Sequence, residues 1–308
     1  MEKLKIGFAG LGRMGFNMVS RILSSGIIDV VVYNRSPQPV LKAEKLGAIP
    51  SDSIHDLVEK LGGGTKIIWM MLPSGEVTEN YFNKILNELS ENDILIDGGN
   101  SNFNETLRRG KKAEEKNVFF LDAGVSGGII AAQRGYPVMV GGNETAYRKI
   151  VPFLETFCAE NGYGLVGPSG SGHYVKMVHN AIEYGMMQAI GEGFDLLKHG
   201  QFDNLDLNKV SGIWNHGTII SGFLMEMVGN ALEKRQNLED ILPVVEDSGE
   251  GRWAAMEAVN HGVPFAINTL ALHSRFSSQN CNTSFGMKLV SAMRNEFGGH
   301  KISLNSEK

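Results

Sequence analysis

A polar stripe interrupts an otherwise apolar segment in the middle of the chain. The segment GHYVKMVHNAIEY ends at Tyr184 and contains Lys176, His179, Asn180 and Glu183. Their spacing of i, i+3, i+4 and i+7 places these four residues on one face of a helix. The surrounding apolar residues are expected to be buried: Val175, Met177, Val178, Ala181, Ile182, Met186 and Met187. Such a stripe is either a solvated face or a surface that meets a ligand.

Two residues of the stripe could transfer protons. Desolvation would lower the pKa of a buried Lys176, which would make it a usable general base near neutral pH. Burial would raise the pKa of Glu183 and let it act as a proton donor. Two helical turns separate the residues by ~10 Å along the axis. A base and an acid at that spacing could act on different carbons of one extended substrate.

A glycine-rich turn near the N-terminus indicates a dinucleotide site. GLGRMG carries Gly10, Gly12 and Gly15 in the spacing G-x-G-x-x-G, after an apolar strand pattern and before a helical pattern. In this context Gly10 allows a tight turn, Gly12 lets the backbone approach a pyrophosphate, and Gly15 allows close packing. The helix N-terminus at Arg13 and Met14 would offer N–H groups to the phosphates.

The end of the second expected strand bears on the choice of cofactor. NAD enzymes place a carboxylate there to hold the ribose 2'-hydroxyl, and a carboxylate would repel a 2'-phosphate. Here the residues are Asn34, Arg35 and Ser36, none of which is acidic. We therefore expect NADP, with NAD as the alternative.

Polar and small residues close three later strand patterns. They belong to MMLPSG, DGGNS and DAGVSGG. Open α/β sheets bind ligands at the carboxyl ends of their strands. We expect Met71, Leu72 and Pro73 at the cofactor, and Asn100 at the cofactor or a substrate hydroxyl. Ser126, Gly127 and Gly128 could form a concave set of N–H donors for a carboxylate.

The first half of the chain alternates short apolar runs with amphipathic stretches. This rhythm predicts a parallel, doubly wound, Rossmann-like sheet in an α/β domain at 1–167. From 168 to 308 the pattern is all-α, and this domain would bind substrate and form a dimer. The expected strands lie at 4–9, 29–34, 65–72, 93–99, 118–124, 136–142 and 162–168. The expected helices include 13–25, 75–88, 102–115, 173–199, 218–233 and 252–261.

Composition excludes several classes of partner. The 308 residues carry 29 basic and 34 acidic side chains, a net charge of -5, which argues against nucleic acid and membrane surfaces. Cys158 and Cys281 are too few for a disulfide framework and belong to no metal-binding pattern. No apolar run has the length of a membrane span, and the N-terminus does not resemble a signal peptide. We expect a cytoplasmic enzyme without a metal.

These motifs together resemble the decarboxylating 6-phosphogluconate dehydrogenases, in a short form. The resemblance runs from GLGRMG through DGGNS, VSGG, GHYVKMVHNAIEYGMMQ and SGEGRW to RNEFGGH. It implies that Lys176 is the base and Glu183 the acid in NADP-dependent conversion of 6-phosphogluconate to ribulose 5-phosphate and CO2. It further implies that Arg275 binds the phosphate, and that Arg294 and His300 enter the site of the partner subunit in a homodimer or dimer of dimers. The substrate contacts that it implies are Asn100, Ser126, Gly127, Gly128, His179, Asn180 and Tyr184.

The sequence also departs from the long-form pattern. Ser248 stands where long members have a lysine at the phosphate, and Ile129 and Ile130 replace two glutamates. One alternative is a β-hydroxyacid dehydrogenase of the 3-hydroxyisobutyrate type, which shares the glycine turn and SGG but lacks the RNEFGGH tail. A second alternative is a non-catalytic NADP-binding sensor, against which the intact Lys176 and Glu183 count.

Overall fold

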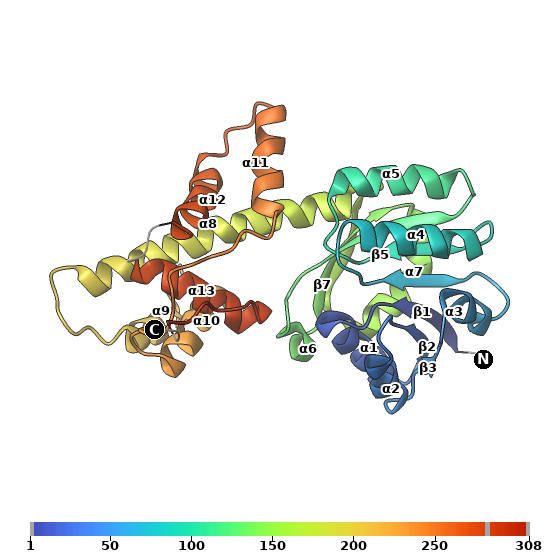
Figure 1. Ribbon diagram of the computed structural model, residues 1–308, viewed down its shortest axis with the longest axis horizontal. Coiled ribbons are helices and arrows are strands. Elements are labelled where there is room, and N and C mark those ends of the chain that lie inside the picture. Colours follow the sequence, from blue (N-terminus) through green and yellow to red (C-terminus); the bar gives the residue numbers. More distant parts are fainter. Residues whose placement is uncertain (1–2, 281–283, 306–308) are drawn as a thin grey trace. The chain divides into compact units, whose positions relative to one another are not determined.

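The computed structural model describes residues 3–280 and 284–305, and its ribbon is drawn in Figure 1. The chain divides into two compact units, Met1–Lys176 and Met177–Lys308. Helix α8 (Ser171–His199) begins in the first unit and continues into the second. The boundary expected after residue 167 falls at the end of strand β8 (Cys158–Gly167).

The first unit contains an eight-stranded sheet with the order β3-β2-β1-β4-β5-β6-β7-β8. The first six strands in this order, β3, β2, β1, β4, β5 and β6, pair in parallel, which confirms the Rossmann-like fold class. All seven expected strands are present, and the two-residue strand β3 is an addition. The other strands are β1 (Leu4–Ala9), β2 (Ile28–Tyr33), β3 (Ile49–Pro50), β4 (Ile67–Met70), β5 (Ile94–Asp97), β6 (Phe119–Val125) and β7 (Tyr136–Gly142).

Strand β7 departs from the expected parallel order. It pairs antiparallel with β6, with Val138 opposite Val125, and β8 then follows β7 in parallel. The link between β6 and β7 contains only the four-residue helix α6 (Ala131–Arg134). That link is too short for the crossover that a parallel neighbour requires.

Apolar cores lie on both faces of the sheet. Phe8 and Val32 belong to one core, and their chain neighbours Ala9 and Val31 belong to the other. This alternation explains why the strands read as continuous apolar runs, since both faces are buried. The helices of this unit are α1 (Arg13–Ser25), α2 (Pro37–Glu44), α3 (Ile54–Leu61), α4 (Glu76–Glu88), α5 (Phe103–Glu114) and α7 (Glu144–Phe157).

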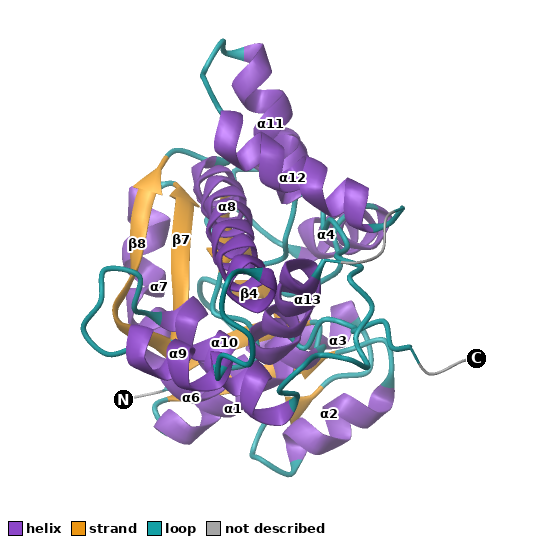
Figure 2. Cartoon of the chain, turned by 90° about the vertical axis from the view of Figure 1, so that its left-hand side faces the viewer, coloured by secondary structure: helices purple, strands orange, loops and turns teal. Residues whose placement is uncertain are grey.

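Over its described residues the second unit consists of helices and loops (Figure 2), apart from one isolated bridge between Ile241 and Leu304. This confirms the expected helical C-terminal region. After α8 come α9 (Leu207–Trp214), α10 (Phe223–Lys234), α11 (Glu250–Asn260), α12 (Ala266–Ser278) and α13 (Phe285–Gly298). Within the described ranges, none of these or the earlier helices combines the length and apolar character that crossing a membrane needs.

The cysteine within the described residues is unsuited to nucleophilic chemistry. Cys158 is a buried free thiol, and burial raises its pKa to about 12. A thiol with so high a pKa is a poor nucleophile. Cys281 lies outside the described residues.

Candidate active site

The glycine-rich turn connects β1 to α1 in the conformation that its sequence predicts. Gly10 has φ +108°, and a side chain there would overlap the carbonyl oxygen of Met71. A side chain at Gly15 would overlap the carbonyl oxygen of Gly10. Gly12 differs, because a Cβ built on it meets nothing within 4 Å. The two outer glycines therefore shape the turn, and the central one leaves open space beside the backbone.

That open space fits a dinucleotide. Gly12 is the N-cap of α1, and no side chain caps the helix there. The first N–H groups of a helix have no acceptor within it, so an anion can accept them. A pyrophosphate beside Gly12 would take the place of a side-chain cap. Arg13 and Met14 are the first residues of the helix.

Asn34 supports this turn from the next strand. Its Oδ1 accepts the N–H of Leu11 at 2.9 Å, and its Nδ2 donates to the Ser36 carbonyl at 2.9 Å. Both amide groups are thus engaged in shaping the loop. Arg35 and Ser36 are exposed, so their side chains remain available to a ligand at the strand end.

Lys176 is buried and held by Asn100. Its side chain lies in α8, is 8% exposed, and donates from Nζ to Asn100 Oδ1 at 2.8 Å. The two residues are 76 positions apart in the chain. The first unit therefore brings together the lysine and the amide that the sequence singled out separately.

A buried carboxylate fixes the loop that carries Asn100. Asp97, at the end of β5, accepts the N–H of Gly99 at 3.0 Å and the hydroxyl of Ser101 at 2.8 Å. Arg109 of α5, 1% exposed, donates to the same carboxylate at 3.0 Å. Neither Asp97 nor Arg109 was predicted from the sequence. An acidic residue that ends a fully apolar strand was the available signal.

A second buried carboxylate holds the start of α8. Asp122 of β6 accepts the N–H of Gly170 at 2.6 Å and that of His173 at 2.8 Å, one on each oxygen. Close packing beside it allows no side chain at Gly124, where a Cβ would lie 2.6 Å from the Cβ of Lys176. Asp122 and Gly124 together set the position of the helix turn that carries Lys176.

We expect Asp122→Asn to destabilise the fold by about 1–3 kcal/mol, because an amide would direct one donor at a backbone donor. The maximal rate should fall while cofactor affinity stays nearly unchanged, since the change displaces Lys176 and not the glycine turn. Urea unfolding and steady-state kinetics measure the two effects. Asp206→Asn is the matched control, because Asp206 accepts an N–H at the exposed start of α9. Equal losses in the two variants would contradict this role.

The Ser126 loop contributes fewer donors than expected. The N–H of Ser126 already donates to the carbonyl of Pro137 at 3.0 Å. The expectation that it joins Gly127 and Gly128 as a backbone donor for a carboxylate is therefore wrong. Strand pairing at the end of β6 causes the difference. Gly127 and Gly128 follow with φ values of +93° and +56°, a geometry that can form a concave donor pair.

In the second unit, Tyr184 of α8 contacts both the loop before α11 and helix α12. Its hydroxyl donates to Asp247 at 3.0 Å and lies 3.2 Å from Ser248 Oγ. The Arg275 guanidinium stacks on its ring, 3.2 Å from the centroid. Arg275 is 2% exposed, and desolvation lowers its pKa to about 10, so it stays charged at neutral pH.

The remaining stripe residues have different surroundings. Asn180 donates to Glu250 at 2.9 Å, and Glu250 is another buried carboxylate that was not predicted from the sequence. His179 is exposed, with Nδ1 3.0 Å from Asn180 Oδ1, and Glu183 is half-buried. The stripe is therefore not a uniformly solvated face.

Part of the apolar surface around the stripe is exposed. Val175, Ile182 and Met186 are 38%, 49% and 52% exposed, so the expectation that they are buried is wrong for a single chain. Met177, Ala181 and Met187 are buried, as expected. The protein covers Val175, Ile182 and Met186 of α8 only in part, which periodicity alone does not reveal.

The two tail residues lie at the end of the second unit. Arg294 is buried in α13, and desolvation lowers its pKa, while the charge of the Tyr184 hydroxyl, next in effect, raises it. His300 follows the helix, and its carbonyl accepts from Asn295 at 2.8 Å. Its ring lies against Phe297, with centroids 6.1 Å apart.

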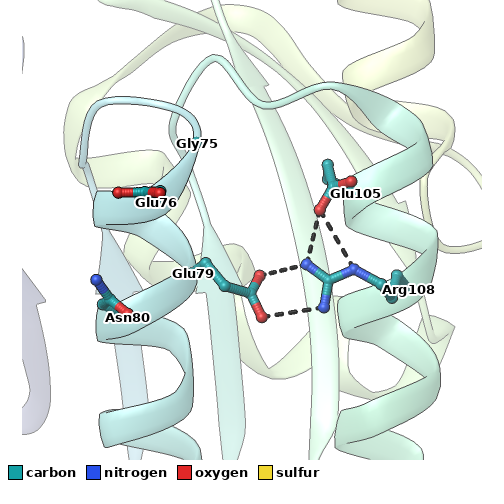
Figure 3. Close-up of a pocket in the computed structure, with 6 residues that line it drawn as sticks. All are labelled: Gly75, Glu76, Glu79, Asn80, Glu105 and Arg108. Atoms are coloured by element: carbon teal, nitrogen blue, oxygen red, sulfur yellow. Dashed lines mark hydrogen bonds and ion pairs between the residues drawn. The ribbon is translucent and has the colours of Figure 1, made fainter.

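An acidic pocket on the first unit is a separate feature. Figure 3 shows Glu79 and Glu105 directed at the guanidinium of Arg108. Gly75, Glu76 and Asn80 complete the lining. The Arg108 contact holds the pKa of Glu79 at about 2. Since Arg108 is already paired with two carboxylates, this pocket does not suit an anionic substrate.

Family models match both parts of the chain. Residues 5–167 match the NAD binding domain of 6-phosphogluconate dehydrogenase. Residues 172–284 match the C-terminal domain of 6-phosphogluconate dehydrogenase.

Individual relatives agree with these matches. A Haloferax volcanii protein named 6-phosphogluconate dehydrogenase, NAD(+)-dependent, decarboxylating, is 39% identical over 97% of this chain and 99% of its own. A 6-phosphogluconate dehydrogenase from Plasmodium falciparum, solved with NADP+ and with 6-phosphogluconate, has a TM-score of 0.82 and 34% identity. The match covers 89% of this chain and 62% of that one. A 3-hydroxyisobutyrate dehydrogenase from Mycobacterium tuberculosis shares the fold, with a TM-score of 0.68 at 21% identity over 94% of this chain and 98% of its own.

Proposed function

The chain belongs to the 6-phosphogluconate dehydrogenase family, and we propose that it converts 6-phosphogluconate to ribulose 5-phosphate and CO2 with reduction of NADP. The observation that carries this proposal is the buried Lys176, which donates a hydrogen bond to Asn100. Lys176 lies on α8, the helix that continues to Glu183. Family membership makes it a nicotinamide-dependent oxidoreductase. The substrate and the choice of NADP are our inference.

Lys176 acts first in the proposed reaction. A bound NADP would supply the hydride acceptor, held by the open turn at Gly12 and the first N–H groups of α1. The amine of Lys176 takes the proton of the 3-hydroxyl as carbon 3 becomes a ketone. The resulting ammonium then polarises the ketone oxygen, which favours loss of the neighbouring carboxyl group as CO2. The electron pair that remains forms an enediol, and Lys176 returns its proton to the oxygen.

Glu183 completes the proposed reaction. The enediol needs a proton on the carbon that has lost CO2, and a carboxylic acid can supply it. Glu183 is half-buried and lies two helical turns beyond Lys176 on α8. Separate donors for the two protonations suit a substrate in which the ketone and this carbon are different atoms.

Two buried arginines favour a phosphorylated substrate over 3-hydroxyisobutyrate. Arg275 and Arg294 are 2% and 6% exposed in the second unit. Burying two guanidinium groups is costly unless an anion accompanies them. 3-Hydroxyisobutyrate carries a single carboxylate, whereas 6-phosphogluconate carries a carboxylate and a phosphate.

A homodimer, or a dimer of such dimers, is part of the proposal. The outer faces of three helices in the second unit expose large apolar side chains. They are Ile182, Met186 and Leu196 on α8, Met256 and Val259 on α11, and Ile267 and Leu270 on α12. Exposed apolar surface of this kind commonly marks an interface.

We expect Arg35→Ala to raise the Michaelis constant for NADP by tenfold or more, about 1.4 kcal/mol, with a much smaller effect for NAD. The reason is loss of a charge-assisted contact to the 2'-phosphate at a strand end without a carboxylate. Kinetics with each cofactor measure it, and Lys42→Ala on exposed α2 is the control. Equal changes for both cofactors, or a wild-type preference for NAD, would overturn the choice of NADP. The test matters because the Haloferax relative is named as NAD(+)-dependent.

The proposed function is tested by offering the purified chain 6-phosphogluconate and 3-hydroxyisobutyrate separately, each with NADP and with NAD. Reduction of the cofactor, followed at its absorbance maximum, is expected with 6-phosphogluconate alone. Turnover of 3-hydroxyisobutyrate instead would favour the non-decarboxylating reaction. Cofactor binding without any turnover would favour a sensor.

A further inference from the structure

Asn100 follows a pair of glycines that do not by themselves fix its position. Gly98 and Gly99 stand between the end of β5 and Asn100, and glycine has more backbone freedom than any other residue. Close packing limits where these two glycines lie. A Cβ on Gly98 would overlap the ring of Trp69, and one on Gly99 would lie 2.8 Å from the carbonyl oxygen of Leu72. Packing thus confines the backbone of the loop, and other contacts must direct Asn100.

Arg109 of α5 supplies those contacts. Its Nη1 donates to Asp97 at 3.0 Å and to Ser101 Oγ at 3.4 Å. Asp97 in turn accepts the hydroxyl of Ser101 and the N–H of Gly99. The residue before Asn100 and the residue after it are therefore both bound to one buried pair of charges.

A second carboxylate fixes the guanidinium itself. Nε of Arg109 donates to Glu79 of α4 at 3.1 Å. The Arg109 side chain is 1% exposed, and burying a charge is costly where an apolar contact would not be. A planar guanidinium held by two carboxylates has a fixed orientation, which an apolar contact does not impose. The contacts of Arg109 are therefore better suited to orienting the loop than to stabilising the fold.

The same helix also contacts the start of α8. Thr106 Oγ1 lies 2.7 Å from Nδ1 of His173, and both side chains are buried. Thr106 and Arg109 are three residues apart, so they share one face of α5. His173 is one turn before Lys176. Helix α5 thus holds the loop with Asn100 and the helix turn with Lys176, and the side chains of these two residues are hydrogen-bonded at 2.8 Å.

We propose that Arg109 is a positioning residue for proton transfer: it holds the loop, through Asp97 and Ser101, so that the amide oxygen of Asn100 stays on Lys176. Because Arg109 is buried, it acts through Asn100 and not by contact with a ligand. A displacement of about 1 Å at a reacting group can reduce a rate by about 10²-fold. The catalytic importance of the Lys176 contact rests on the proposed function, whereas the contacts of Arg109 do not.

A double-mutant cycle tests whether Arg109 acts through Asn100. The four proteins are wild type, Arg109→Met, Asn100→Ala and the double variant, and stopped-flow absorbance measures the hydride step with 6-phosphogluconate and NADP. We expect Arg109→Met to slow this step by about 10²-fold when Asn100 is present. In the Asn100→Ala background it should change the rate by about twofold or less, because the amide that it positions is already absent. Equal losses in the two backgrounds would overturn the proposal.

Two further variants exclude a general effect on folding. Arg108→Met is the matched control, because Arg108 is the neighbouring arginine of α5 and pairs with Glu79 and Glu105 at the surface (Figure 3). Its rate should stay within about twofold of wild type. Arg109→Lys keeps the buried positive charge and tests the proposal if Arg109→Met does not fold. An ammonium lacks the fixed fork of a guanidinium, so we expect a loss of about tenfold, again only when Asn100 is present. A wild-type rate in Arg109→Lys and in any folded Arg109→Met protein would contradict the proposal.

The chemical reactivity of Lys176 separates this inference from the proposed function, because it is measured without substrate. Each protein is treated briefly with acetic anhydride, and mass spectrometry compares acetylation of Lys176 with that of the exposed Lys198. An amine released from the amide is more accessible to the reagent. We therefore expect severalfold faster acetylation of Lys176 in Arg109→Met and in Asn100→Ala, no further increase in the double variant, and no change in Arg108→Met.

The two failures give different results. Unchanged acetylation of Lys176 in Arg109→Met and Arg109→Lys, or increases that add in the double variant, would contradict the positioning role. The expected acetylation pattern in a protein that does not oxidise 6-phosphogluconate would contradict the proposed function alone.

Discussion

Lys176→Met is expected to reduce the rate of cofactor reduction by about 10²–10⁴-fold, the usual contribution of a positioned general base. Methionine has no proton acceptor for the substrate hydroxyl and no charge to polarise the ketone. The dissociation constant of NADP should stay nearly the same, because the glycine turn lies on a different element. Stopped-flow absorbance measures the hydride step directly, and a fluorescence titration measures cofactor binding.

Lys198→Met is the matched control for this variant. Lys198 lies in the last turn of the same helix, is exposed, and donates to Asn237 at 3.1 Å. Its replacement should leave the rate within a factor of two or so, as for most exposed positions. A Lys176→Met enzyme with substantial residual hydride transfer would remove the base assignment.

Glu183→Gln is expected to slow steady-state turnover by about 10²–10⁴-fold through a different step. Glutamine cannot donate a proton to the enediol, but Lys176 and the cofactor site are unchanged. The first turnover should therefore still reduce one equivalent of NADP rapidly, and later turnovers should be slow. Rapid-mixing absorbance distinguishes this burst from a uniform loss of rate.

The control for this step is Glu192→Gln, since Glu192 is an exposed residue on α8 that accepts from Gln188 at 2.8 Å. It should show neither the burst nor the slow phase. A Glu183→Gln enzyme that turns over at the wild-type rate would mean that another group donates the proton. A lost burst would instead place Glu183 in the hydride step.

Local sequence patterns were sufficient for the glycine turn and for most strands. Gly10 and Gly15 occupy positions where the backbone itself excludes a side chain, and a short motif records such a requirement. Strands β4 and β5 are buried throughout and β6 nearly so, so their apolar runs are easy to recognise. The direction of β7 was not recognisable, because it depends on the length of a link and not on the composition of the strand.

The supports of the candidate site could not be found in the same way. Asp122 contacts backbone groups 48 and 51 residues further along the chain. Asp97 holds an arginine and a loop that only the fold brings together. Polar side chains at strand ends have many possible partners, and the topology selects among them.

The central claim is that one substrate loses both a hydride and CO2, and 6-phosphogluconate labelled with ¹³C at carbon 1 tests it most directly. The wild-type enzyme is incubated with this substrate and NADP, and labelled CO2 and reduced cofactor are measured in the same reaction. The account predicts one labelled CO2 for each molecule of cofactor reduced. Reduced cofactor without labelled CO2 would contradict it, and would show that the enzyme oxidises its substrate without decarboxylating it.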